Sequence, residues 1–193
     1  DRAMAGGHGV LLLSAHFTTL EVGVSIFLDV CPGLDSMYRP QRNAMLDVMI
    51  RRGRGRYVRR QIARDNVRML LRSLKAGRVV AYFPDQTYVG NQSALLPFFG
   101  EPAMTNVAVS KLAEIGNASV LTYLFRRLPG RACYVVTIGP PLEGVPSGDR
   151  LADTQRWVER LERHIRLAPD QHLWIYKKFK SRPPPFPDPY ADI

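Results

Sequence analysis

The feature that most constrains the fold is a short, uninterrupted apolar run followed at once by a helical pattern. Residues 10–15 read VLLLSA, a length and composition typical of a β-strand that is buried on both faces. Thr18 and Glu21 then have the spacing of a capping box, which predicts a helix from there to about residue 30. A buried strand that leads directly into a helix is the repeating unit of α/β proteins.

The same order of elements recurs along the chain. Further strands are expected at residues 36–39, 79–83, 119–125 and 133–138, and further helices at residues 41–52, 65–75, 106–116 and 151–167. This alternation predicts an α/β fold, a two-layer or sandwich arrangement in which helices flank a mostly parallel sheet, with an antiparallel pair near the C-terminus. Residues 87–102 are rich in turn formers and are expected to form a loop, whose apolar group at residues 95–99 either covers a substrate or packs within the protein.

Length and cysteine content limit the organisation of the chain. The 193 residues contain no internal repeat and no linker, so a single domain spanning residues 1–193 is expected. Cys31 and Cys133 are too few for a disulfide framework and show no metal-ligand spacing with the four histidines. We therefore expect a reduced compartment, no metal site and no cofactor. No apolar run approaches the roughly 18 residues that would span a bilayer.

Positive charge is concentrated in one stretch of the chain. The formal net charge is +10, and residues 51–68 contain eight arginines against a single acidic residue, Asp65. This concentration of positive charge favours an anionic partner: a nucleic acid, an acidic lipid or an acidic protein. The alternative is a basic face that is only solvated. No glycine-rich phosphate loop is present, and this argues against a nucleotide-binding protein.

His16 is the candidate general base, because it follows a buried strand and precedes a helix, where functional groups of α/β sheets commonly gather. The alternative is a structural histidine that hydrogen-bonds its own loop. Residues five apart on one helix point about 140° away from each other, so a contact with Glu21 requires His16 to lie outside the helix. A carboxylate on the imidazole would fix its tautomer and stabilise the imidazolium, whereas Glu21 could equally serve the helix cap alone.

Five blocks in a fixed order carry a resemblance to a known family. They are residues 16–21 (HFTTLE), 38–40 (YRP), 64–66 (RDN), 83–86 (FPDQ) and 173–180 (LWIYKKFK). With them the chain resembles the lipid A late acyltransferases of the lysophospholipid acyltransferase superfamily over nearly its whole length, and the first two blocks are most similar to the lauroyl-transferring branch. The resemblance implies a glycerolphosphate-acyltransferase-like fold and acyl transfer from an acyl carrier protein thioester to a hydroxyl of a phosphorylated, Kdo-bearing lipid A precursor. It also implies action at a membrane surface, the cytoplasmic face of the bacterial inner membrane, without nucleic acid.

The resemblance also assigns roles to individual residues. It implies that His16 and Glu21 are the catalytic pair, that Arg64 binds the acceptor phosphate with Arg39 nearby, and that Asp85 is the acidic residue of the third block. Asp85 and Gln86 depart from the Glu-Gly of the wider superfamily, although Asp-Gln suits the lipid A branch. The N-terminal membrane-associating region of the family is expected to be missing from this chain.

The chemistry of the residues agrees with this interpretation. An alcohol attacks a thioester efficiently only when a base removes its proton, an effect of about 10²- to 10⁴-fold, and the thiolate leaves readily without a covalent acyl-enzyme. Arg39 and Arg64 can bind phosphate through two parallel hydrogen bonds. The competing hypotheses are an acyltransferase acting on a glycerophospholipid or another glycolipid, and a non-enzymatic binder of nucleic acid or acidic membrane. Trp174 and the lysines after it are expected at a lipid interface or, alternatively, on a core-packed terminal helix.

Overall fold

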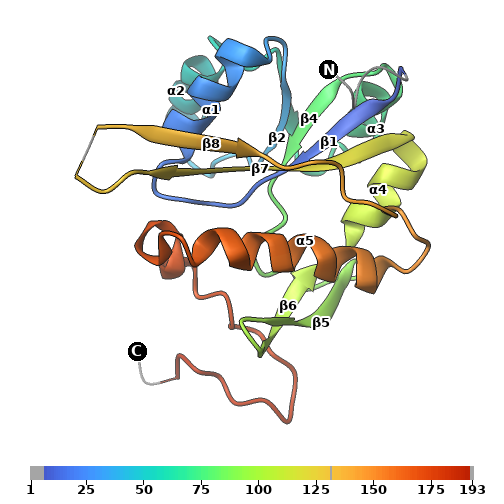
Figure 1. Ribbon diagram of the computed structural model, residues 1–193, viewed down its shortest axis with the longest axis vertical. Coiled ribbons are helices and arrows are strands. Elements are labelled where there is room, and N and C mark those ends of the chain that lie inside the picture. Colours follow the sequence, from blue (N-terminus) through green and yellow to red (C-terminus); the bar gives the residue numbers. More distant parts are fainter. Residues whose placement is uncertain (1–6, 131, 192–193) are drawn as a thin grey trace.

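The computed structural model describes residues 7–130 and 132–191, and within them a six-stranded mixed sheet forms the centre of the molecule (Figure 1). Its strands are β1 (Gly9–Leu13), β2 (Asp35–Tyr38), β3 (Arg60–Ala63), β4 (Val79–Tyr82), β7 (Ala118–Arg127) and β8 (Tyr134–Ile138). They are ordered β3-β2-β4-β1-β7-β8; the first five run parallel and β8 pairs antiparallel with β7. The predicted α/β fold with a mostly parallel sheet is confirmed.

Helices cover both faces of this sheet. They are α1 (Leu20–Val30), α2 (Ala44–Arg54), α3 (Val67–Lys75), α4 (Ala108–Gly116) and α5 (Arg150–Ile165). In Figure 1, α1 and α2 lie above the strands β7 and β8, and α4 and α5 lie below them. Helix α1 contacts β7 and β8, whereas α4 packs against both α3 and α5. The arrangement follows from right-handed crossovers between parallel strands, which place helices on opposite faces when the chain reverses its direction across the sheet.

Strand β1 explains why its sequence is apolar throughout. It lies between β4 and β7, so its backbone is paired on both edges, and helix α3 packs against it. Leu11, Leu12 and Leu13 are almost completely buried as a result. A strand with no solvent-facing side cannot show the alternating pattern of a half-exposed strand.

Helix α1 packs directly against the sheet at Gly23, a position where any side chain would clash. A Cβ atom added to Gly23 would lie 2.4 Å from the ring of Phe125 on β7. The missing side chain therefore brings α1 against the sheet and sets the position of the helix N-terminus beside His16. The predicted capping box at this N-terminus is wrong, because the first turn is capped by Thr19 and no side-chain capping hydrogen bond forms there.

Two strand regions differ from the sequence prediction. Strand β3 lies within the arginine-rich stretch, for which no strand was predicted. Residues 87–102 are not merely a loop, since β5 (Ser93–Phe98) and β6 (Glu101–Asn106) form an antiparallel hairpin in that region. The side chain of Phe98 is buried against the rings of Trp174 and Phe179, so this apolar group packs within the protein.

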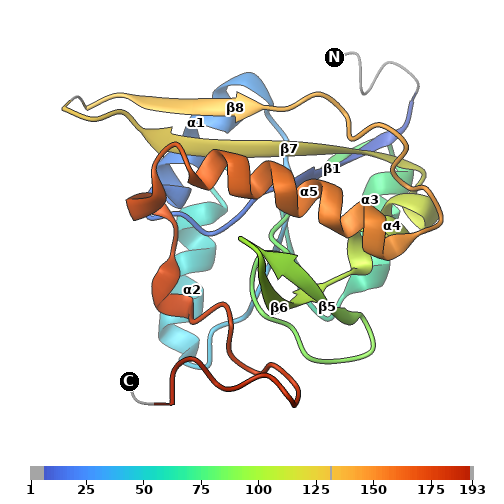
Figure 2. The same cartoon turned by 60° about the horizontal axis from the view of Figure 1, so that its bottom comes forward.

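After α5 the chain continues as an extended segment with two short 3-10 turns, η1 (Pro169–Gln171) and η2 (Trp174–Tyr176). Figure 2 shows this segment leaving the end of α5 and passing toward the β5–β6 hairpin. Trp174 therefore lies on a 3-10 turn, partly exposed, and not on a terminal helix. Within the residues that the structure describes, no helix has the length and apolar character required to cross a membrane.

Candidate active site

The candidate site residues converge at the carboxyl ends of four neighbouring strands. His16 follows β1, Arg39 follows β2, Arg64 follows β3 and Gln86 follows β4, and these strands are adjacent and parallel in the order β3-β2-β4-β1. Because parallel strands end at the same edge of a sheet, the loops after them surround one crevice. These four side chains, together with Glu21, line a cleft of about 1860 Å³.

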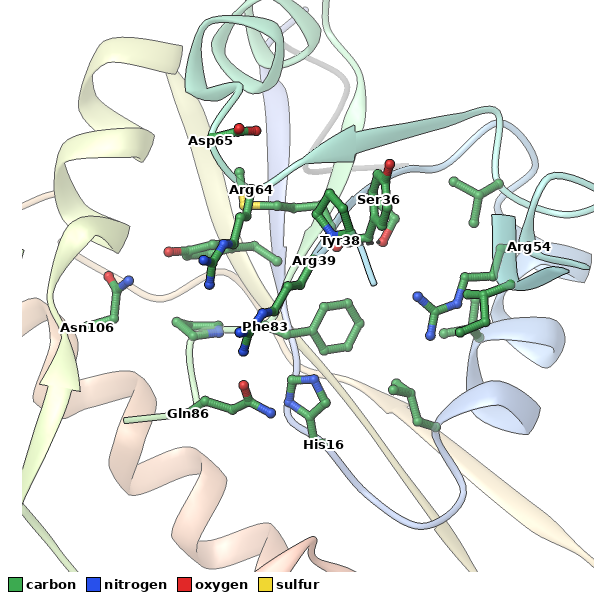
Figure 3. Close-up of a pocket in the computed structure, with 18 of the residues that line it drawn as sticks. His16, Ser36, Tyr38, Arg39, Arg54, Arg64, Asp65, Phe83, Gln86 and Asn106 are labelled. Carbon is green, nitrogen blue, oxygen red and sulfur yellow. Dashed lines mark hydrogen bonds between the residues drawn. The ribbon is translucent and has the colours of Figure 1, made fainter. Parts of the chain in front are cut away.

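The cleft has polar groups at its centre and apolar walls on both sides. Figure 3 shows Arg39, Arg64, Gln86 and His16 directed toward a common space, with Arg54 reaching in from the opposite side. The walls are aliphatic side chains from four helices: Leu20, Val24, Ile26, Ile50, Val67, Leu71, Leu112 and Ile115. Ordinary small-molecule pockets occupy about 300–1,000 Å³, so the cleft has room for a much larger amphipathic ligand.

The imidazole of His16 is held by the carboxylate of Asp85. The His16 Nδ1 lies 2.8 Å from Asp85 Oδ1, and the backbone N–H of His16 donates to Asp85 Oδ2 over 2.9 Å. Asp85 is buried beneath the histidine, whereas the His16 side chain is 28% exposed and faces the cleft. With Nδ1 directed at the carboxylate, Nε2 is the ring nitrogen available to a substrate.

The electrostatics of this pair favour a charged histidine after proton uptake. Burial works to lower the pKa of His16, but the hydrogen bond and negative charge of Asp85 outweigh it and raise the pKa above its ordinary value of 6.5. Burial likewise works to raise the pKa of Asp85, and the hydrogen bonds from His16 reverse this and lower it. The pair is therefore arranged so that an imidazolium formed at His16 is stabilised by an ionised carboxylate.

Glu21 lies at the cleft but is not paired with His16. No hydrogen bond or ion pair joins the two among the described residues, contrary to the contact expected from the sequence. The Glu21 carboxylate instead accepts a 2.5 Å hydrogen bond from Arg54 Nη2, and its side chain is 65% exposed. The carboxylate expected beside the imidazole is supplied by Asp85, a residue 69 positions further along the chain.

Part of the arginine cluster is neutralised and part is available. Arg54, Arg59 and Arg51 pair with acidic side chains, those of Glu21, Asp35 and Asp47. Arg39 and Arg64 are exposed at the cleft, and neither guanidinium has a hydrogen bond or ion pair within the described part of the chain. These two arginines have the free donors that an anionic group in the cleft would need.

One residue near the site was missed by sequence reasoning. Lys178, for which a lipid interface or a core-packed terminal helix was expected, is buried with a relative exposure of 7%, and its Nζ donates to the backbone carbonyl of Asp85 over 2.8 Å. The only sequence signal was its place in a short run of lysines near the C-terminus, which does not distinguish a buried lysine from solvated ones. Cys31 and Cys133 are free thiols, and no group of metal-ligating side chains is found among residues 7–130 and 132–191.

Comparison with known proteins agrees with the geometry of the cleft. Residues 1–181 match the family model described as bacterial lipid A biosynthesis acyltransferase. The chain belongs to this family. It is 34% identical to the lipid A biosynthesis lauroyltransferase of Escherichia coli (strain K12) over 184 residues, covering 94% of this chain and 60% of the relative. It is 33% identical to the palmitoleoyltransferase of the same organism over 186 residues, covering 94% of this chain and 59% of the relative.

Identity to the Escherichia coli myristoyltransferase is lower, 25% over 183 residues, with 94% of this chain and 56% of the relative covered. The chain thus spans about three fifths of the length of the curated relatives that it matches.

Proposed function

We propose that this acyltransferase-family chain moves a fatty acyl group from an acyl carrier protein thioester to a hydroxyl of a phosphorylated lipid A precursor. The observation that carries the proposal is the His16–Asp85 pair at the centre of a large cleft, with the unpaired Arg39 and Arg64 at the same strand ends. The names of the relatives support a lipid A acceptor. The apolar walls of the cleft suit acyl chains, and the arginines suit phosphate.

His16 acts as the general base in this proposal. Its Nε2 takes the proton of the acceptor hydroxyl as the oxygen attacks the thioester carbonyl; the new C–O bond forms, the C–S bond breaks, and the proton passes to the departing thiolate. Asp85 holds the tautomer that leaves Nε2 free and stabilises the transient imidazolium. Among the described residues no hydroxyl or thiol side chain hydrogen-bonds to the His16 ring, and the thiolate is already a good leaving group, so transfer proceeds without a covalent acyl-enzyme.

Glu21 assists the base through Arg54. The positive charge of Arg54 works to lower the pKa of His16, and Glu21 pairs with that guanidinium and partly offsets its charge. Glu21 thereby keeps the imidazole basic without touching it. Arg39 and Arg64 bind the acceptor phosphates, and Gln86, which faces the same space, offers its amide to a sugar hydroxyl (Figure 3).

A membrane contact is supported by helix α2. No described side chain of α2 is buried, and its apolar side chains are largely exposed: Met45, Leu46, Val48 and Met49. Its last turn is basic, with Arg51, Arg52 and Arg54. An apolar surface beside basic residues is favoured at the boundary of an acidic bilayer. Because α2 also lines the cleft, we place this surface at the cytoplasmic face of the bacterial inner membrane, where a lipid acceptor enters the cleft directly.

Acyl transfer by the purified protein tests the function. The donors are acyl carrier protein and coenzyme A thioesters, and the acceptors are a phosphorylated lipid A precursor and a glycerophospholipid. We expect transfer from the carrier protein to the lipid A precursor. The rate of this transfer should fall by at least about 10²-fold in His16→Ala. The exposed His8→Ala is the matched control and should retain activity. Preferential use of the glycerophospholipid would overturn the acceptor assignment, and full turnover by His16→Ala would overturn the base.

A further inference from the structure

The segment after α5 is tied to the loop that carries His16. The backbone N–H of Thr18 donates to the carbonyl of Gln171 over 2.9 Å, and the N–H of Leu173 donates to the carbonyl of His16 over 3.1 Å. Between these two bonds, Phe17 and His172 form an isolated antiparallel bridge. The backbone that immediately follows the catalytic imidazole is therefore paired with a segment more than 150 residues away in the chain.

The same segment is also tied to the loop that carries Asp85. Lys178 Nζ donates to the carbonyl of Asp85 over 2.8 Å, and the Thr87 hydroxyl donates to the carbonyl of Lys178 over 2.7 Å. A third bond runs from the Tyr176 hydroxyl to the carbonyl of Thr87 over 3.1 Å. Residues 171–180, which we call the C-terminal strap, thus hold the base on one side and its carboxylate on the other.

Burial of the Lys178 ammonium, which makes this connection, costs free energy. A buried ammonium loses most of its hydration, and here it is compensated by a backbone carbonyl, by the face of the Phe98 ring at 5.5 Å and by the nearby charge of Asp85. Burial lowers the pKa of Lys178 to about 8 against the opposing influence of Asp85. A methionine or leucine at this position would fill the same apolar space without that cost.

We propose that Lys178 is a positioning residue for acyl transfer, which locks the Asp85 loop onto the C-terminal strap so that the carboxylate stays in register with the His16 imidazole. Lys178 contacts the main chain of Asp85 and not the cleft, so it acts on the reaction through the His16–Asp85 pair alone. The inference rests on the proposed function of His16 as the base. It predicts that a residue outside the cleft controls turnover without controlling substrate binding.

The first test is the variant Lys178→Met, which keeps the length of the side chain and removes both its charge and its donor. We expect kcat to fall about ten- to a hundredfold, because misplacement of a catalytic group by about 1 Å costs on that order, while KM for both substrates stays within about twofold. Lys75→Met removes the same charge from an exposed position on α3 and should leave kcat unchanged.

A spectroscopic readout separates positioning from general stability. The proton on His16 Nδ1 that faces Asp85 should give a downfield NMR resonance, which is assigned by its loss in His16→Ala. We expect this resonance to broaden or disappear in Lys178→Met while the rest of the spectrum stays folded. Wild-type kcat with an intact resonance in Lys178→Met would overturn the positioning role, even if the thermal midpoint fell.

A second variant tests the positioning role of Lys178 if Lys178→Met does not fold. Thr87→Val is nearly isosteric and removes only the hydroxyl that donates to the Lys178 carbonyl. A several-fold loss of kcat with a weakened His16 resonance supports the proposal, and wild-type values for both overturn it. If His16→Ala itself retains turnover, the proposed function fails instead, so the two failures are distinguishable.

Discussion

Replacement of Asp85 by asparagine tests the proposed chemistry most directly. Asp85 accepts two hydrogen bonds from one residue, from the backbone N–H and the Nδ1 of His16. Asparagine has only one acceptor oxygen. If that oxygen keeps the backbone bond, the amide NH₂ faces Nδ1, which must then become the acceptor, and the ring proton moves to Nε2. A protonated Nε2 cannot take the proton of an attacking alcohol.

The magnitude follows from the role of the pair. Loss of a general base costs about 10²- to 10⁴-fold, and the analogous tautomer error in serine proteases costs about 10⁴-fold. We therefore expect Asp85→Asn to lower kcat/KM by about 10²- to 10⁴-fold, which corresponds to roughly 3 to 5.5 kcal/mol of transition-state stabilisation. The loss should equal that of His16→Ala within about tenfold, because both changes remove the same base.

The pH dependence of this variant has a definite sign. As the proposed base, His16 must be neutral in the wild-type protein, and Asp85 raises its pKa, so we expect activity to decline as the pH falls through a value above 6.5. Asp85→Asn removes the cause of that upward shift, so its residual activity should persist to lower pH.

Steady-state rates from pH 5 to 9 measure both effects, and Asp170→Asn, an exposed carboxylate on η1, is the matched control. Near wild-type kcat/KM with an unmoved acid limb in Asp85→Asn would refute the reasoning.

Three further predictions concern the phosphate site, the mouth of the cleft and the seating of α1. Arg64→Ala should reduce kcat/KM about ten- to a hundredfold with the phosphorylated acceptor and less with its dephosphorylated analogue, from the loss of a charged hydrogen bond; equal losses in the two assays would argue against a phosphate contact. Glu21→Gln should shift the acid limb of the pH–rate profile to lower pH, because it leaves the positive charge of Arg54 near His16 uncompensated; a shift to higher pH would contradict the indirect role. Gly23→Ala should destabilise the protein by about 1–3 kcal/mol in thermal or urea unfolding, since its Cβ would meet Phe125 at 2.4 Å, whereas Gly53→Ala, which meets nothing within 4 Å, should be neutral or stabilising.

Features with a local physical origin could be predicted from the sequence. An uninterrupted apolar run is compatible with few structures other than a buried strand, and the place of His16 directly after that run puts it at the carboxyl edge of the sheet. Arg39, at the end of a predicted short strand, could be expected at the same edge for the same reason, whereas no strand was predicted before Arg64 and its place was implied only by the resemblance. Because parallel strands end at the same edge of a sheet, His16 and Arg39 are expected to lie near each other.

Features that depend on weak or interrupted patterns were not predicted. Strand β3 consists of RQIA with only Ile62 buried, so its apolar signal is a single residue. The β5–β6 hairpin places Pro97 opposite Pro102, and prolines are typical of turns and strand edges rather than of strand interiors. The tertiary structure stabilises the hairpin by packing Phe98 against the C-terminal strap, a contact that no local pattern reveals.

The sequence by itself determined the kind of sheet and the position of His16 at its carboxyl edge, because hydrophobic periodicity and position within a strand–loop–helix unit are local properties. Only the tertiary structure decided which carboxylate holds His16, since strand β4 inserts between β2 and β1 and brings Asp85 beneath the imidazole while α2 draws Glu21 to Arg54. The burial of Lys178 was decided in the same way, by a strap that returns across the loops after β1 and β4. Strand order and chain return depend on the packing of distant segments, and a pattern read along the chain carries no information about which distant residues that packing brings together.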